Sequence, residues 1–100
     1  MPIFQFPEDP VWNEEADAVE FPVQVGEYLG RVFVTRRTLQ GIVGHTPQPD
    51  EAVQQVCMNL PLFERAVEQR ITARSLDPDA NIHLTGRDLR RAAGPGTASS

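Results

Sequence analysis

The chain has 100 residues, a formal net charge of −5 at pH 7 and 40% hydrophobic residues. A chain of this length builds a single hydrophobic core, which excludes a two-domain organisation, and the hydrophobic share is too high for a wholly disordered protein. The acidic balance disfavours non-specific binding to a phosphate backbone, because such binding requires clustered positive charge.

The charges are unevenly distributed along the chain. Residues 1–30 contain seven acidic residues and no basic residue, whereas residues 31–100 contain nine arginines and seven acidic residues. The chain has no lysine, and arginine, alanine, valine, proline and glycine are abundant. This usage is typical of a GC-rich bacterial genome, so we expect a bacterial protein.

The chain carries no sequence signal for secretion or for a membrane span. Cys57 is the only cysteine and cannot form a disulfide within the chain, which favours a reducing compartment. The N-terminus lacks the basic residues and the apolar run of a signal peptide. No stretch approaches the roughly 18 apolar residues of a membrane span. We therefore expect a cytoplasmic protein with no membrane association.

Residues 1–12 are predicted to form an extended arm. Three of the first ten residues are proline, and each proline fixes its own φ and disfavours helical geometry at the residue before it. The arm leads to Trp12. Asn13 is then expected to cap a single helical turn, because its side chain can accept a hydrogen bond from a free backbone N–H.

Residues 19–34 are predicted to form a β-hairpin. Apolar side chains alternate with glutamate, proline and glutamine between positions 19 and 25, as in a half-buried strand. Gly26 and Glu27 suit a two-residue type II′ turn. Pro22 cannot donate a hydrogen bond, so its strand should lie at a sheet edge or turn the Pro22 nitrogen away from its partner. The turn predicts a register in which these pairs share one face: Val25 with Tyr28, Val23 with Gly30, Phe21 with Val32, and Val19 with Val34.

Three helices are predicted to follow the hairpin. Thr35 can cap a short first helix that ends at Gly44. The second helix begins near Asp50 and has an apolar stripe that should face the core and bury Cys57. Pro61 either kinks this helix or separates it from the third, which is predicted over 62–74. The stripe of the second helix consists of Val53, Val56, Cys57 and Leu60.

The C-terminal part is predicted to contain one short strand and a final helical turn or two. Ile82 and Leu84 would lie on one side of the strand. Thr85 and Asp88 resemble a capping box with aspartate in place of glutamate, opening a short helix that reaches position 93. Residues 94–100 have too little apolar surface to order and are predicted to be a disordered tail. The single domain is therefore expected to span residues 1–93.

These elements predict an α+β fold with the order ββαααβ. The hairpin and the C-terminal strand would form a small antiparallel sheet, packed on one face by two or three helices. A sheet of this size is marginal alone. We therefore expect the helix over 62–74 to cover the hairpin face that carries Phe21, Val23, Val32 and Val34.

The order and spacing of these segments resemble a known family. The resemblance rests on Phe6-Pro7 followed by Trp12, on the strands at 19–25 and 30–35, and on residues 63–71 and 81–84. Together they resemble the small bacterial family catalogued as domain of unknown function 1488. The resemblance implies a compact cytoplasmic α+β domain, and it implies no activity and no functional residue.

No pattern in the chain points to enzyme chemistry. Cys57, His45 and His83 are isolated from one another, unlike the closely spaced ligands of a metal motif. The chain has no glycine-rich phosphate loop and no nucleophile motif. We expect no catalytic residue, no metal and no cofactor. A small enzyme or ligand carrier is a third class of function and would need a deep pocket containing one of the histidines.

Two surfaces are candidates for binding. The sheet face opposite the core is expected to carry Phe33 and Leu29 beside Arg31 and His83, and it stays exposed unless the N-terminal arm, a partner or a second copy covers it. The arginines form two groups, which make either ion pairs with the acidic residues or an anion-binding patch. The groups are Arg31, Arg36 and Arg37, and Arg87, Arg90 and Arg91.

The sequence therefore favours a non-enzymatic protein-interaction domain that binds an unknown protein partner or a second copy of the chain. The alternative is a nucleic-acid-associated or regulatory module that uses the two arginine groups. The residues expected to contact a partner are Trp12, Arg31, Phe33, Arg36 and Arg37.

Overall fold

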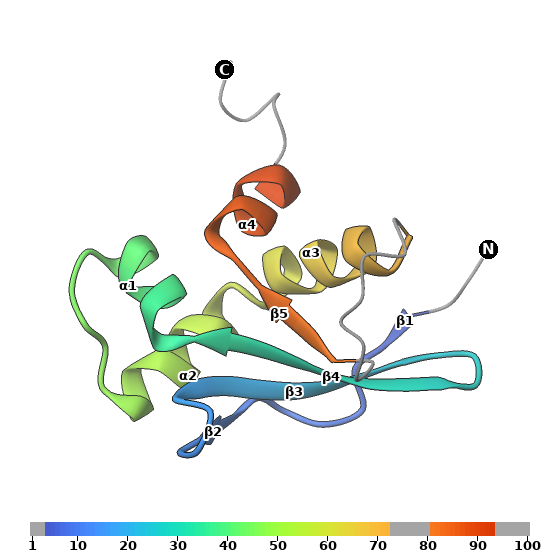
Figure 1. Cartoon of the computed structure of the whole chain (residues 1–100), viewed down its shortest axis with the longest axis horizontal. Coiled ribbons are helices and arrows are strands. Elements are labelled where there is room, and N and C mark those ends of the chain that lie inside the picture. Colours follow the sequence, from blue (N-terminus) through green and yellow to red (C-terminus); the bar gives the residue numbers. More distant parts are fainter. Residues whose placement is uncertain (1–3, 73–80, 94–100) are drawn as a thin grey trace.

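The computed structural model describes residues 4–72 and 81–93, which form five strands and four helices (Figure 1). The strands are β1 (Phe4–Gln5), β2 (Val11–Asn13), β3 (Ala18–Val25), β4 (Tyr28–Thr35) and β5 (Ile82–Leu84). The helices are α1 (Arg36–Val43), α2 (Pro49–Met58), α3 (Leu60–Thr72) and α4 (Gly86–Ala93). The tail predicted over 94–100 and the end of the helix predicted over 62–74 lie outside the described residues.

The β3–β4 hairpin has the predicted register. Gly26 adopts a φ of +59°, which glycine tolerates without strain, and the two-residue turn joins Val25 to Tyr28. The pairing of Phe21 with Val32 and of Val19 with Val34 follows from that turn. The side chains of these four residues therefore point to the same side of the sheet.

Pro22 lies in an inner strand at a position where no hydrogen bond is lost. Because Val25 and Tyr28 close the turn, hydrogen-bonded pairs alternate from there, and Pro22 and Arg31 form a non-hydrogen-bonded pair. The Pro22 nitrogen thus points to the other edge of β3. There β1 pairs with residues 24–25 and β2 with residues 18–20, which leaves a gap opposite Pro22. Of the two predicted alternatives, an edge strand or a Pro22 nitrogen turned away from its partner strand, the structure has the second.

The N-terminal arm adds two short strands to the edge of β3 instead of folding across the sheet. Phe6 packs against Phe21 with the ring centroids 6.0 Å apart, and Trp12 also packs against the core cluster. The arm therefore does not cover Phe33 with these aromatic side chains. The predicted turn at Asn13 is present: Asn13 ends β2, and its Oδ1 accepts a hydrogen bond from the backbone N–H of Ala16 in the following turn, at 2.9 Å.

The sheet is mixed and not wholly antiparallel as expected. β5 runs parallel to β4, with Val32, Phe33 and Val34 opposite residues 82–84, and the order across the sheet is β1–β3–β4–β5, with β2 also paired to β3. The chain leaves the end of β4, passes through α1–α3 and returns beside the start of β4, so it enters β5 in the same direction. The α+β class and the order ββαααβ are confirmed, followed by α4.

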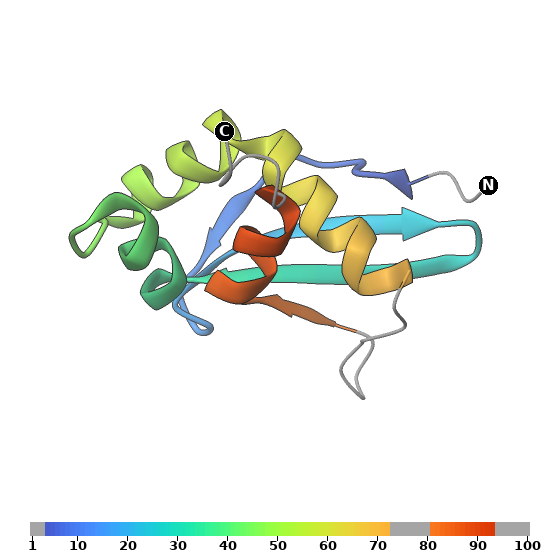
Figure 2. The ribbon, with the colours of Figure 1, turned by 90° about the horizontal axis from the view of Figure 1, so that it is seen from above.

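The core lies between one face of the sheet and the helices. Seen from above, α3 and α4 lie across the hairpin (Figure 2). Phe63 and Val67 of α3 are at most 1% exposed, which confirms that this helix covers the predicted face. The sheet contributes Val19, Phe21, Val23, Val32, Val34, Ile82 and Leu84 to the core cluster, and the helices contribute Leu39, Ala52, Val56, Phe63, Ala66, Val67, Leu89 and Ala92.

The helix ends follow the sequence signals, but the face of α2 that packs against the core differs from the predicted one. Thr35 Oγ1 accepts a hydrogen bond from the N–H of Thr38, and Gly44 ends α1 with a φ of +86°. Pro61 separates two helices: it stands in the first turn of α3, where a missing N–H breaks no helical bond. Cys57 is exposed and not buried as predicted, because Ala52 and Val56 turn α2 toward the core along a different line.

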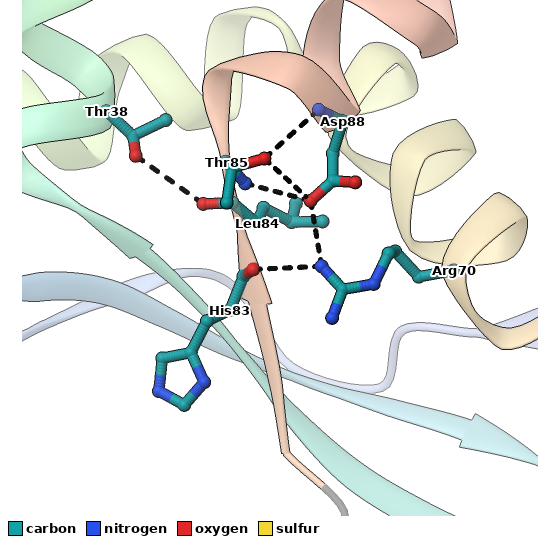
Figure 3. Close-up of polar contacts among 6 residues, drawn as sticks. All are labelled: Thr38, Arg70, His83, Leu84, Thr85 and Asp88. Carbon is teal, nitrogen blue, oxygen red and sulfur yellow. Dashed lines mark hydrogen bonds and ion pairs between the residues drawn. The ribbon is translucent and has the colours of Figure 1, made fainter. Parts of the chain in front are cut away.

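A buried polar network joins α3, β5 and α4 (Figure 3). Asp88 Oδ2 accepts hydrogen bonds from Arg70 Nη1 at 2.8 Å, from the Thr85 N–H at 3.0 Å and from Thr85 Oγ1 at 3.1 Å. Thr85 Oγ1 in turn accepts from the Asp88 N–H, as predicted for a capping box. Arg70 Nη1 also donates to the carbonyl of His83 at 3.0 Å. The network fixes the last strand and helix to α3.

Candidate functional site

The second face of the sheet is the main candidate surface. The helices pack against the opposite face, and alternate residues of four strands point away from them. Leu29, opposite Gln24, is 65% exposed, and Val11, opposite Glu20 on the other side of β3, is 55% exposed. We call this surface the open face; it comprises Val11, Glu20, Pro22, Gln24, Leu29, Arg31, Phe33 and His83.

Two aromatic rings stack on the open face. The parallel pairing of β4 with β5 places His83 directly beside Phe33. Their ring centroids are 5.1 Å apart and the ring planes differ by 15°. Phe33 is half-buried and His83 is exposed. The stack gives the face a flat aromatic platform, the kind of side chain that contributes most to protein interfaces.

A charged pair lies beside this platform. Arg31 Nη1 donates to Glu20 Oε2, and Asn13 Nδ2 donates to Glu20 Oε1 at 3.0 Å. The Arg31 side chain is 62% exposed, whereas that of Glu20 is only 14% exposed. A guanidinium carries five N–H donors in a planar fork. Arg31 can therefore hold Glu20 and still present donors to a second molecule.

A shallow hollow adjoins Arg31 at the end of the face nearest the hairpin turn. Its volume is about 400 Å³. The walls come from the arm, from both hairpin strands and from the residue before β5: Pro7, Glu8, Pro22, Gln24, Leu29, Gly30, Arg31 and Asn81. The hollow is therefore large enough to accommodate a side chain of another molecule.

The structure divides the five residues predicted to contact a partner between different surfaces. Arg31 and Phe33 lie on the open face, whereas Trp12 lies on the core side of β2. The Arg36 guanidinium carbon lies 5.0 Å from the Trp12 ring centroid, and Arg36 Nε lies 3.1 Å from a carboxylate oxygen of Asp17. Arg37 is exposed on α1. Trp12 and Arg36 thus contact each other at one end of the sheet.

The two arginine groups do not share a face. Arg31 belongs to the open face, whereas the arginines of α4 are exposed on the helical side. Arg31 and Arg36 form ion pairs with Glu20 and Asp17. For these two arginines the first of the two predicted alternatives, ion pairs with acidic residues, is therefore present.

Two contributions to the open face are not predicted from the sequence. Val11 falls within the predicted extended arm, and β2 pairs it with Glu20 and so places it on this face. Asn13 is predicted only as a cap; its Oδ1 makes that cap bond, and its Nδ2 also supports the Glu20 carboxylate. The Val11-Trp12-Asn13 alternation is the signal that indicates a strand, and three residues are too few to make it decisive.

The described part of the chain shows no metal-binding cluster. Within residues 4–72 and 81–93, no group of three or more histidine, cysteine, aspartate or glutamate side chains could hold a metal ion. His45 instead lies 2.8 Å from Glu51. In the same residues, every helix is too short or too polar to cross a lipid bilayer.

Comparisons with known proteins identify the family. The family described as "Protein of unknown function (DUF1488)" matches residues 4–84. The fold is similar to the crystal structure of a protein of unknown function from the same family, from Shewanella loihica PV-4, with a TM-score of 0.70 and 17% identity, covering 81% of this chain and 90% of that chain. No curated protein matches the chain. Because the family match spans most of its length, the chain belongs to the DUF1488 family of proteins of unknown function.

Proposed function

We propose that the protein is a non-enzymatic interaction domain that forms a homodimer through the open face. The observation that carries this proposal is the exposure of Leu29 and Val11 on the sheet face that carries the Phe33–His83 stack. An exposed sheet face with apolar and aromatic side chains is typical of contact sites in soluble proteins. Burying it against a second copy would remove it from water.

The charges on the open face favour a second copy over a strongly charged partner. Glu20 and Arg31 lie side by side and have opposite signs. In a twofold-symmetric dimer the same patch occurs on both subunits, so each Arg31 can approach the other copy's Glu20. The face therefore meets its own copy without an unbalanced charge.

The size of the face predicts a dimer that dissociates readily. With a rise of about 3.3 Å per residue and a spacing of about 4.8 Å between strands, the sheet offers roughly 400–500 Å² per copy. Two copies would bury roughly 800–1,000 Å², near the lower limit for specific interfaces. We expect dissociation constants in the micromolar range, on the order of those of transient complexes.

Sedimentation velocity across a range of protein concentrations tests the proposal. The mass of the full chain should rise from 11.1 kDa toward twice that value as the concentration increases. Leu29→Asp should remain monomeric, because dimerisation would require the new carboxylate to be buried in the interface. Met58→Asp is the matched control: Met58 is 67% exposed on α2, and this variant should dimerise like the wild type. A wild-type chain that stays monomeric at millimolar concentration contradicts the proposal.

A further inference from the structure

An apolar pocket lies between the helices, on the other side of the sheet from the open face. Its volume is about 340 Å³, within the range of sites for small ligands. It is bordered by α1, by the junction of α2 with α3 and by α4. Its apolar walls include Leu39, Ile42, Leu62, Phe63 and Leu89.

The pocket extends from the surface to the core. Leu39 and Phe63 are at most 1% exposed, whereas Ile42 at the rim is 46% exposed. Gly41 also lines the pocket, and a Cβ added there meets no atom within 4 Å. The hydrated apolar surface lies at the rim, where Ile42 is exposed, and a ligand that displaces this water gains free energy.

The pocket carries one positive charge and no negative charge in its lining. Arg90 is the charged lining residue, and its Nη1 lies 3.3 Å from the position that a Cβ on Gly86 would occupy. The side chain therefore lies back along α4 beside the pocket. The Arg90 side chain has no ion pair or hydrogen bond with the described residues. Its neighbours on α4, Arg87 and Arg91, are also exposed, so this region has excess positive charge.

We propose that this pocket binds a small amphipathic anion, with its carboxylate on Arg90 and its apolar body against Ile42 and Leu89. A guanidinium matches a carboxylate with two parallel hydrogen bonds, and the apolar walls match a short alkyl chain or an aromatic ring. Gln55 and Asn59 add polar side chains to the lining. The proposal does not depend on the dimer, because pocket and open face lie on opposite sides of the sheet.

The chain's own C-terminal segment is a poor match for this pocket. The sequence after position 93 is Gly-Pro-Gly-Thr-Ala-Ser-Ser, with little apolar surface and no acidic side chain. A free anion with an apolar body satisfies both the walls and the charge.

Titration of the full chain with decanoate, followed by backbone amide NMR, tests the proposal. Decanoate should shift the amide signals of Gly41 and Gly86 saturably, and decanol, which lacks the charge, should bind about tenfold more weakly. Arg90→Gln should abolish this preference for the anion. Arg91→Gln is the matched control, since Arg91 is exposed on the same helix outside the pocket lining, and it should keep the preference.

A second pair of variants tests the place of binding. Gly41→Leu should fill the pocket and weaken binding of both probes at least tenfold, whereas Gly41→Ala should leave it within about twofold, because one methyl group occupies little of the space. Leu29→Asp should bind decanoate normally, which separates this result from the dimer test. The proposal fails if decanoate leaves both glycine signals unchanged, if decanol binds equally well, or if only an acidic peptide binds there.

Discussion

The two faces of the β3–β4 hairpin share one backbone and differ in what surrounds their side chains. On the inner face Val19, Phe21 and Val32 are at most 1% exposed. On the open face Leu29 is 65% exposed and Glu20 pairs with Arg31. Because both faces belong to the same hydrogen-bonded ladder, the difference is one of burial. The inner face should therefore determine stability, while the open face is available for binding.

The largest expected effect comes from exchanging the buried aromatic residue of the hairpin. Phe21→Ala should lower the free energy of unfolding by about 3–5 kcal/mol, because it leaves a cavity next to Phe6. Phe33→Ala, on the open face, should lower it by less than about 1.5 kcal/mol. Urea unfolding followed by circular dichroism measures both, in a Leu29→Asp background so that dissociation of a dimer does not contribute. Equal losses in the two variants contradict the contrast between the faces.

The next largest contrast is between the stability contributions of two ion pairs, Asp88–Arg70 near the core and Glu20–Arg31 on the open face. Asp88 and Arg70 have side-chain exposures of 11% and 15%, and Asp88 also accepts hydrogen bonds from Thr85. Asp88→Ala should cost about 2–3 kcal/mol, since it removes charged hydrogen bonds and leaves Arg70 with less compensation for burial. Glu20→Ala on the open face should cost less than about 1 kcal/mol. Thermal unfolding of both variants measures the two losses of stability. A larger loss for Glu20→Ala than for Asp88→Ala contradicts the prediction.

The features that the sequence predicted correctly are encoded by residues close together along the chain. Gly26 and Glu27 specify the turn, and the turn then fixes all the hairpin pairs by counting. Thr85 and Asp88 specify the start of α4 in the same local way. The core face of the hairpin follows from both signals, since alternation and register agree. These predictions required no knowledge of distant contacts.

The features that were wrong depend on contacts between distant parts of the chain. The direction of β5 depends on where α3 delivers the chain, which three strand residues do not encode. The orientation of α2 depends on how Ala52 and Val56 pack, and the apolar stripe that included Cys57 was equally consistent with another rotation. The open face was only half predicted for the same reason. Phe33 and Arg31 follow from alternation, but the stacking of His83 on Phe33 depends on the register that places these two residues opposite each other.

The smallest expected effect is the change in the free energy of unfolding when Glu64 or Glu20, on opposite sides of the sheet, is replaced. The two changes should have opposite signs. Burial raises the pKa of Glu64 in α3, and the nearby Glu68 raises it further. The folded state therefore holds this proton more tightly than the unfolded state does. The contribution of Glu64 to stability is fully present below the unfolded pKa and is lost as pH rises through the higher folded pKa.

Replacing each glutamate by glutamine tests these signs. Glu64→Gln should raise the free energy of unfolding at pH 7 by about 0.2–0.5 kcal/mol, the size of a like-charge pair one helical turn apart, and the gain should vanish at pH 3. Glu20→Gln should instead lower it at pH 7, because it removes the charge that pairs with Arg31. Urea unfolding at both pH values measures the two differences. If Glu64→Gln lowers the free energy of unfolding at pH 7, the charged Glu64 carboxylate is stabilised by its surroundings more than burial and Glu68 destabilise it, and the prediction is wrong.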